Sequence, residues 1–188
     1  MDTLLFPLLS SSKIENPTAY RLVGTSLRRV DTSIEIPVSS FLNNCLVGNA
    51  SSLGGGKGSD LSEHIHTLIY ELHIISPKLL TRVIPNVCIQ LQAEEEEVRL
   101  KAVQLMGSLF ASAQTDYASN FPRNFKEFLG RFQDQSTIIR QTMVDSCCRI
   151  GDAKPHLNAV IEGTPTININ LDTLTWHIAY RTPREETA

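Results

Sequence analysis

Residues 83–110, VIPNVCIQLQAEEEEVRLKAVQLMGSLF, contain two runs of apolar residues at helical spacing with an acidic turn between them. Residues 124–150, NFKEFLGRFQDQSTIIRQTMVDSCCRI, have the same order of features. An offset of 41 residues places Arg99 of the first segment over Arg140 of the second. Each segment therefore predicts a pair of helices in which an arginine lies near the start of the second helix.

The 41-residue period indicates the fold class. Repeats of about 40 to 47 residues are typical of HEAT and armadillo proteins, whose helix pairs bury their apolar faces by stacking. We expect an all-α, HEAT/armadillo-type α-α superhelical solenoid over residues 1–163, because helical spacing extends over most of this range. The apolar stripes predict helices near residues 17–27, 37–48, 61–75, 80–91, 98–109, 125–132 and 139–150.

Two segments interrupt this pattern. Residues 49–59 are rich in glycine and predict a flexible linker between helices. Residues 164–188 begin TPTININLDTLTWHIAY, in which polar and apolar residues alternate and β-branched side chains are frequent. This pattern favours an irregular or β-patterned tail, with disorder as the alternative.

The glycine-rich stretch around Lys57 matches a phosphate-binding loop only in part. Such a loop needs a Ser or Thr after its lysine to hold Mg²⁺, whereas Gly58 follows Lys57, and Ser51 occupies the position of the first glycine. We therefore expect a linker and no cofactor. A nucleotide-dependent enzyme using Lys57 is a remote alternative.

Neither a metal site nor a catalytic set is expected. His64 and His66 lie on nearly opposite sides of a helix, and His73 is two turns from His66, so ordinary surface or groove histidines are favoured. Four cysteines lack zinc-site spacing and are interpreted as reduced core thiols: Cys45, Cys88, Cys147 and Cys148. The chain is thus not expected to be an enzyme.

Composition narrows the classes of partner. The 17 basic and 20 acidic side chains give a net charge of −3, which does not indicate a nucleic-acid binder. The sequence has no apolar run long enough to span a bilayer, and Asp2 occupies a position where a signal peptide carries positive charge. We expect an intracellular protein that does not bind membranes.

Charged residues suggest one structural and one binding role. Glu94 to Glu97 precede Arg99, and we favour a helix-dipole role for these acids and ion pairs across repeats for the arginine, with an acidic binding patch as the alternative. A loose basic ridge is the candidate partner-binding surface, although a solvated face is the plainer interpretation. Its members are Lys78, Arg82, Lys101, Arg123, Lys126 and Arg131.

Several stretches in one order resemble the HEAT-repeat cohesin regulators named for precocious dissociation of sisters. These stretches are SEHIHTLIYEL, LLTRVIPNVCIQL, VRLKAVQLMGSLF and FLGRFQDQSTIIR, and the resemblance covers about residues 15–156. The chain is similar to a short or truncated form of such a protein, because the family's following helices are replaced after about Gly163. A truncated isoform, a divergent paralogue and an imperfect gene model would each have this pattern.

The resemblance implies a non-enzymatic scaffold that regulates sister chromatid cohesion from the nucleus, with roles in mitosis and DNA repair. The partners it implies are the kleisin subunit of cohesin, the wings-apart-like release factor and the cohesin acetyltransferase, with any contact to chromatin or DNA being indirect. A generic HEAT or armadillo adaptor in transport or signalling is the alternative function.

Overall fold

The computed structural model describes residues 5, 8, 17–29, 31–50 and 64–163. All regular structure within these ranges is helical, which confirms the all-α class. The elements are α3 (Pro17–Arg29), α4 (Asp31–Ala50), α6 (Ile65–Ile75), η2 (Pro77–Leu80), α7 (Ile84–Gln90), α8 (Glu96–Phe110), α9 (Tyr117–Asn120), α10 (Pro122–Leu129), η3 (Gly130–Gln133), α11 (Thr137–Ala153), η4 (Pro155–Leu157) and α12 (Asn158–Glu162).

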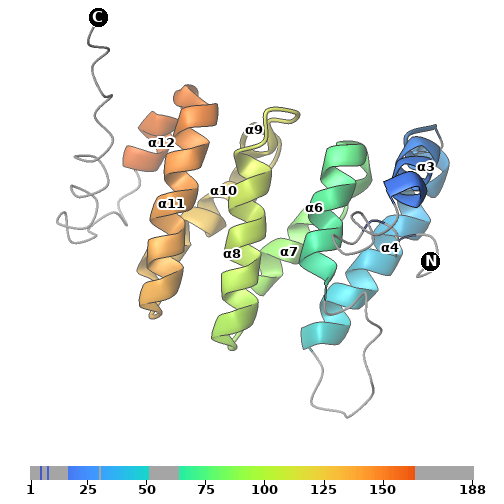
Figure 1. Ribbon diagram of the computed structural model, residues 1–188. Coiled ribbons are helices and arrows are strands. Elements are labelled where there is room, and N and C mark those ends of the chain that lie inside the picture. The colour runs from blue at the N-terminus through green and yellow to red at the C-terminus, as the bar shows by residue number, and fades with distance from the viewer. Residues whose placement is uncertain (1–4, 6–7, 9–16, 30, 51–63, 164–188) are drawn as a thin grey trace, which may run out of the picture.

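The helices form a stack of pairs, as the 41-residue period predicts. In Figure 1, α6, α8 and α11 lie side by side along the stack, and α7 and α10 lie behind them. The central helix α8 packs against α7 of its own unit, against α6 before it, and against α10 and α11 of the following unit. In this view the units follow one another from right to left in chain order, and each unit contacts its neighbours.

Proline positions explain several helix boundaries. α6 ends at Ile75, Ser76 is extended with φ of −151° and ψ of 94°, and Pro77 opens η2. Proline disfavours helix in the residue before it but costs no hydrogen bond in a first helical turn. The boundary predicted at Ser76-Pro77 is confirmed.

Two runs predicted as single helices are divided. A turn at residues 81–83 separates η2 from α7, and α10 passes into η3 at Gly130. Pro85, in the first turn of α7, has no N–H with which to continue a helix from the residues before it. The prediction of one continuous helix over each of residues 80–91 and 125–132 is therefore wrong, although the apolar stripe of each run is buried; Ile89, outside the first stripe, is exposed.

The core connects each helix pair to the next. Phe110, at the end of α8, is fully buried, and its ring centroid lies 4.9 Å from that of Phe125 and 5.3 Å from that of Phe128. Gly107 lets α8 and α11 approach closely, because a Cβ at this position would lie 2.5 Å from the Oγ of Ser146. Stacking of neighbouring units thus buries the apolar faces that a single pair would expose.

Some predicted features lie outside the described residues. These are the glycine-rich loop with Lys57, within residues 51–63, and the C-terminal segment 164–188. α4 begins at Asp31, before the predicted start near Pro37, and extends to Ala50, which includes the first residues of the predicted linker. Among the helices that the structure describes, none is long and apolar enough to cross a bilayer.

Candidate protein-interaction surface

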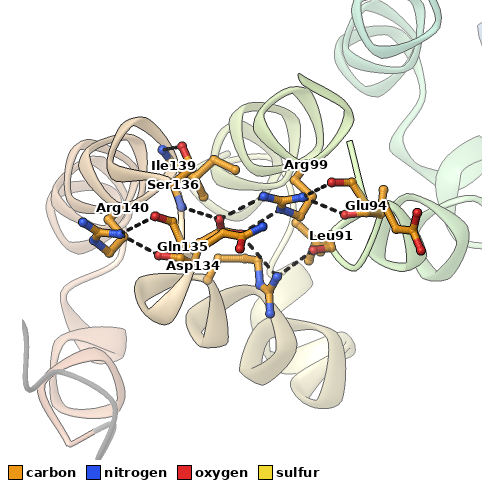
Figure 2. A network of polar contacts seen from close by, with 10 residues as sticks. Leu91, Glu94, Arg99, Asp134, Gln135, Ser136, Ile139 and Arg140 are labelled. Carbon is orange, nitrogen blue, oxygen red and sulfur yellow. Dashed lines mark hydrogen bonds and ion pairs between the residues drawn. The ribbon is translucent and has the colours of Figure 1, made fainter. Parts of the chain in front are cut away.

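A buried ion pair connects two successive helix pairs. Nε of Arg99, near the start of α8, donates to Oδ2 of Asp134 at 2.9 Å, and Nη2 donates to Oδ1 at 3.2 Å (Figure 2). The side chains are 5% and 2% exposed, respectively. Two parallel hydrogen bonds between a guanidinium and a carboxylate form one of the strongest charged contacts in proteins. The predicted pairing of an arginine across repeats is confirmed for Arg99.

Both repeat arginines also bind the turn before their own helix. Nη1 of Arg99 donates to the carbonyl oxygens five and six residues before it, at 2.6 and 2.9 Å. Nη1 of Arg140 donates to the carbonyl oxygens five and six residues before it, at 3.1 and 2.7 Å. Each arginine thereby satisfies backbone acceptors in the turn between the two helices of its unit, and the two units share this geometry.

Asp134 lies at the centre of the network in Figure 2. Besides Arg99, it accepts hydrogen bonds from the backbone N–H of Ser136 at 2.9 Å and from Nη1 of Arg131 at 3.3 Å. Desolvation alone would raise the pKa of this buried carboxyl, but the hydrogen bonds from Arg99 and Ser136 and the charges of both arginines outweigh it and lower the pKa. Asp134 is therefore charged at neutral pH.

A polar hollow of about 420 Å³ opens beside this network. Its lining includes Arg99, Asp134 and three glutamines: Gln92, Gln133 and Gln135. A glutamine amide can both donate and accept hydrogen bonds, so this lining can bind the backbone of an extended peptide. Three charged side chains of the hollow, Arg99, Arg131 and Asp134, are paired with one another and hold its shape.

The acidic turn has the structural role that the sequence suggests. Glu96 and Glu97 occupy the first turn of α8, where carboxylates interact favourably with the helix dipole. An Oε1 atom of Glu97 lies 2.6 Å from Nζ of Lys101, and the hydrogen bond from this lysine lowers the pKa of Glu97. Much of the negative charge in this turn thus interacts with the helix dipole and with Lys101 of the same chain.

The six residues of the predicted basic ridge come from different parts of the stack. Lys101 lies on α8, whereas the others lie on η2, the turn after it, α10 and η3. Along the chain they form two close pairs, Lys78 with Arg82 and Arg123 with Lys126, and two single residues. Four of the six form ion pairs within the chain: Arg82 with Glu35, Lys101 with Glu97, Arg123 with Glu127, and Arg131 with Asp134.

The two remaining ridge residues carry positive charge that the described part of the chain does not neutralise. Lys78 and Lys126 are both exposed, and within the described residues neither forms an ion pair. Lys126 borders an apolar hollow of about 520 Å³ at the α12 end of the stack, whose lining includes Phe125, Leu129 and Leu157. An apolar groove with a lysine at its border suits an apolar segment that carries an acidic residue.

His73 is predicted to be a surface or groove histidine; it is buried and not at the surface, although it is part of the lining of a hollow. Its Nδ1 lies 3.2 Å from the hydroxyl of Tyr117, and its Nε2 lies 2.6 Å from that of Ser112. Because the Tyr117 hydroxyl donates to the carbonyl of Pro77 at 3.1 Å, it accepts from Nδ1–H of a neutral imidazole. Burial, with a smaller contribution from the charge of Lys154, lowers the pKa of His73 to about 4. Two hydrogen bonds compensate the burial.

His66 and two of the cysteines, Cys88 and Cys147, have structural positions as well. Nε2 of His66 lies 2.8 Å from Oε1 of Gln90, and burial lowers the pKa of His66. Burial raises the pKa of Cys88 to about 11 and that of Cys147 to about 12, as expected for inert core thiols. Within the described ranges, no three His, Cys, Asp or Glu side chains are placed to hold a metal ion.

Sequence reasoning missed one buried cation. Lys154, after α11, is 7% exposed, and its Nζ donates to the carbonyl of Thr115 at 2.6 Å and lies 3.7 Å from Asp116. Burial lowers the pKa of Lys154, although Asp116 partly offsets this effect. The position of this lysine directly before Pro155 is the only local feature of the sequence that marks it. The contacts of Lys154 connect the end of α11 to the loop after α8.

Comparison with known proteins gives one family. The family model described as "Sister chromatid cohesion protein PDS5 protein" matches residues 1–169. Relatives include sister chromatid cohesion protein PDS5 homolog A of Danio rerio, 38% identical over 140 residues, homolog A of Homo sapiens, 36% identical, and homolog B of Mus musculus, 34% identical. Each alignment covers 74% of this chain, but only 10% of the two A homologs and 9% of the B homolog. The chain therefore spans about a tenth of the length of these relatives.

Proposed function

The chain belongs to the PDS5 family of sister chromatid cohesion proteins, and from this premise we propose that it regulates sister chromatid cohesion as a non-enzymatic scaffold that binds cohesin. The observation that carries the proposal is the family match over residues 1–169, which includes both arginine-bearing helix pairs. Since the chain spans about a tenth of these relatives, the proposal concerns the binding that residues 1–169 provide and not the whole activity of those proteins.

The proposed mechanism is binding to a preformed surface. The buried pair of Arg99 with Asp134 and the close contact of Gly107 with Ser146 hold successive units in a fixed relative position. A rigid surface loses little conformational entropy when an extended partner segment binds to it. Such a scaffold changes how long a complex persists by favouring one bound arrangement, without making or breaking covalent bonds.

The partners we propose are the kleisin subunit of cohesin, the wings-apart-like release factor and the cohesin acetyltransferase, and the place of action is the nucleus. Contact with chromatin or DNA is proposed to be indirect, through cohesin. The net charge of −3 supports this, because direct binding to DNA requires basic side chains that neutralise several phosphates.

The proposed contact surface is the basic ridge with its neighbouring hollows. Lys78 and Lys126 are the strongest candidates for direct contact with an acidic segment, since within the described residues neither forms an ion pair. Arg82, Lys101 and Arg123 can exchange an internal carboxylate for one of a partner at little cost, because their ion pairs are exposed. Arg131 contributes by supporting Asp134.

Direct binding tests the proposal. The purified 188-residue chain would be titrated calorimetrically with the recombinant kleisin subunit, the release factor and the acetyltransferase in turn. We expect a saturable complex with at least one of them. A folded chain that binds none of the three contradicts the proposal, and recovery of transport or signalling proteins alone indicates a generic adaptor. ATP binding that is lost in Lys57→Ala would show that the non-enzymatic assignment is wrong.

A further inference from the structure

α3 carries three exposed arginines and no acidic residue. Its sequence is PTAYRLVGTSLRR, and the arginines are Arg21, Arg28 and Arg29. Within the described ranges none of the three forms an ion pair. Arg82 and Arg123, which are also exposed, each have a carboxylate partner in the chain. α3 therefore carries positive charge that the described part of the chain does not neutralise.

The carboxylates described on the helices next to α3 have partners already. α3 packs against α4 and α6, and the structure describes one acidic side chain on each, Glu35 and Glu71. Glu35 lies 3.2 Å from Nε of Arg82. Glu71 is buried and accepts a hydrogen bond from the hydroxyl of Tyr20 at 2.6 Å. Neither is bound to an arginine of α3.

The exposed residues of α3 form a regular surface. Arg21 and Arg28 are seven residues apart, and so are Leu22 and Arg29. Seven residues make almost two helical turns, so each pair lies on one face with a separation of about 10.5 Å along the axis. The exposed positions between the pairs, residues 25–26, are a threonine and a serine, whose side chains are small.

We propose that this face of α3 is the docking site for an acidic amphipathic helix of a partner protein. Carboxylates seven residues apart on that helix would pair with the arginines, and an apolar side chain would cover Leu22. The inference goes beyond the proposed contact surface, in which no residue precedes Lys78, and it does not depend on the partner being a subunit of cohesin.

The spacing favours a helix over an extended segment. Side chains on one side of an extended chain recur about every 6.7 Å, which does not match a separation of about 10.5 Å. Side chains seven residues apart on a second helix have the same separation as the arginines. The small residues at positions 25–26 leave room for a second helix to pack closely.

An exposed leucine favours a protein over a nucleic acid. Leu22 is 67% exposed and lies on the same face as Arg29, so apolar surface of a partner would gain by covering it. Sites for single-stranded nucleic acid combine basic side chains with aromatic ones on which bases stack. The one aromatic residue of α3, Tyr20, is half-buried and bonded to Glu71.

Interaction with the helix dipole explains only part of this charge. Arg28 and Arg29 lie in the last turn of α3, where cations are favourable, but Arg21 lies in the second turn. Nε of Arg28 donates to the carbonyl of Ile75 at 3.1 Å, and within the described residues its two Nη groups remain available for a carboxylate. Lys78, three residues after Ile75, is exposed and adds positive charge near this end of α3.

The test uses a designed peptide as the probe. It contains three copies of the heptad Ala-Glu-Glu-Leu-Ala-Ala-Ala, and its control has glutamine in place of every glutamate. In the ¹⁵N-labelled full chain, we expect the glutamate peptide to shift the backbone resonances of α3 and the Nε–H resonances of Arg21 and Arg29, assigned from their lysine variants. The glutamine peptide should not, and the Nε–H resonance of Arg99 should not move, because Asp134 occupies it.

Affinities measured by fluorescence polarisation give the second result. We expect the glutamate peptide to bind about fivefold tighter than the glutamine peptide, as two or three exposed ion pairs should allow. This preference should fall below about twofold in Arg21→Gln with Arg29→Gln. It should persist in Lys101→Gln with Arg123→Gln, which changes the net charge equally at exposed positions.

The apolar part of the site has its own variant. Leu22→Gln should weaken binding of the glutamate and glutamine peptides alike, by about twofold to threefold, because both peptides keep their leucines. The exposure of Leu22 makes loss of folding an unsuitable explanation for that result. Equal binding by the unmodified chain and Leu22→Gln would contradict the proposed apolar contact.

Three outcomes would overturn the docking site itself. A peptide of the same composition in shuffled order that binds as tightly as the heptad peptide would show charge attraction without a helical register. A preference for glutamate that survives in Arg21→Gln with Arg29→Gln would place the binding elsewhere. Duplex DNA that shifts the α3 resonances at a lower concentration than the glutamate peptide, at equal ionic strength, would identify a nucleic-acid surface instead.

Discussion

Arg99 and Asp134 form a bidentate ion pair that is almost completely shielded from water, with side chains 5% and 2% exposed. The arginine belongs to α8, and the aspartate belongs to the turn before α11, 35 residues later. The pair therefore connects two units of the stack, and it does so in a low-dielectric environment where a charge without its partner is very unfavourable.

Removal of one partner of this pair should be strongly destabilising. Asp134→Asn leaves the Arg99 guanidinium buried without a counter-charge, and we expect the free energy of unfolding to fall by about 3 to 5 kcal/mol. Urea unfolding followed by circular dichroism measures this change. The exposed pair of Arg123 with Glu127 serves as the control, and Glu127→Gln should change stability by less than about 1 kcal/mol.

Simultaneous replacement of both partners should cost less than replacement of either. In Arg99→Met with Asp134→Leu, neither charge of this pair remains buried, so the double variant should be more stable than Asp134→Asn. A double-mutant cycle gives the coupling free energy. If the change in the free energy of unfolding of the double variant equalled the sum of the changes in Arg99→Met and Asp134→Leu, the two side chains would not stabilise the chain as a pair.

The repeat of arginines could be predicted from the sequence, but the identity of the carboxylate could not. Arg99 and Arg140 recur at a fixed offset beside acidic turns, and this pattern was sufficient to predict ion pairs across units. The sequence also offers Glu94 to Glu97 as acceptors. The choice of Asp134 depends on which turn of the next unit lies opposite α8, and only the packing of the two units determines that.

Burial of polar residues was the part that sequence periodicity could not predict. His73 and Lys154 obtain their partners from the loop after α8, at separations of 39 residues from Ser112 and Thr115, respectively. A helical stripe shows which face of a helix is apolar, but it carries no information on a loop that folds over that face. The divided helices have a similar cause, because Val83 stays buried in the core although it lies in the turn between η2 and α7.

Gly107 should not tolerate a side chain. A Cβ there would lie 2.5 Å from Oγ and 2.7 Å from Cβ of Ser146, so Gly107→Ala must push α8 and α11 apart. We expect a loss of about 1 to 3 kcal/mol in the free energy of unfolding, as for other overpacked cores. Ser146→Gly removes both clashing atoms and should restore most of the loss in the double variant.

Gly24, a buried helical glycine with room for a methyl group, provides the comparison for that experiment. A Cβ on Gly24 of α3 would lie 3.6 Å from Cδ1 of Ile75, which is an ordinary contact distance. Gly24→Ala should therefore be neutral or stabilising by up to about 1 kcal/mol, because alanine favours helix more than glycine does. Equal destabilisation by the two alanines would show that the α8–α11 contact is not the cause.

Stability should fall as the solution is acidified through the range in which unfolded histidine gains a proton. The pKa of His73 is lowered from 6.5 to about 4, so between these values the unfolded chain binds a proton that the folded chain excludes. At 1.36 kcal/mol per pH unit, His73 should account for about 2 kcal/mol of stability lost between pH 6.5 and 5. Well above pH 6.5 the residue is neutral in both states and contributes no pH dependence.

Variants isolate the contribution of His73 from those of the other titrating groups. In His73→Gln, the loss of stability between pH 6.5 and 5 should be smaller than in the unmodified chain, because glutamine does not titrate. A profile that is identical in the two proteins would show that His73 is free to protonate in the folded chain.

Lys126 and Arg123 lie one turn apart on α10, but only Arg123 has a carboxylate partner in the described part of the chain, Glu127, at 3.2 Å. If the basic ridge contacts an acidic segment, Lys126→Glu should slow association with the kleisin subunit and weaken binding by about fivefold or more at low salt, because charges at the border of an interface act mainly on the association rate. Arg123→Gln should change the affinity less than twofold. Both substitutions are at exposed positions, and their effects on the free energy of unfolding should stay within about 0.5 kcal/mol.

Surface plasmon resonance at two salt concentrations measures the association and dissociation rates. Unchanged association in Lys126→Glu would place the contact elsewhere on the solenoid and leave the proposed function standing, whereas absence of kleisin binding by the unmodified chain would contradict that function itself.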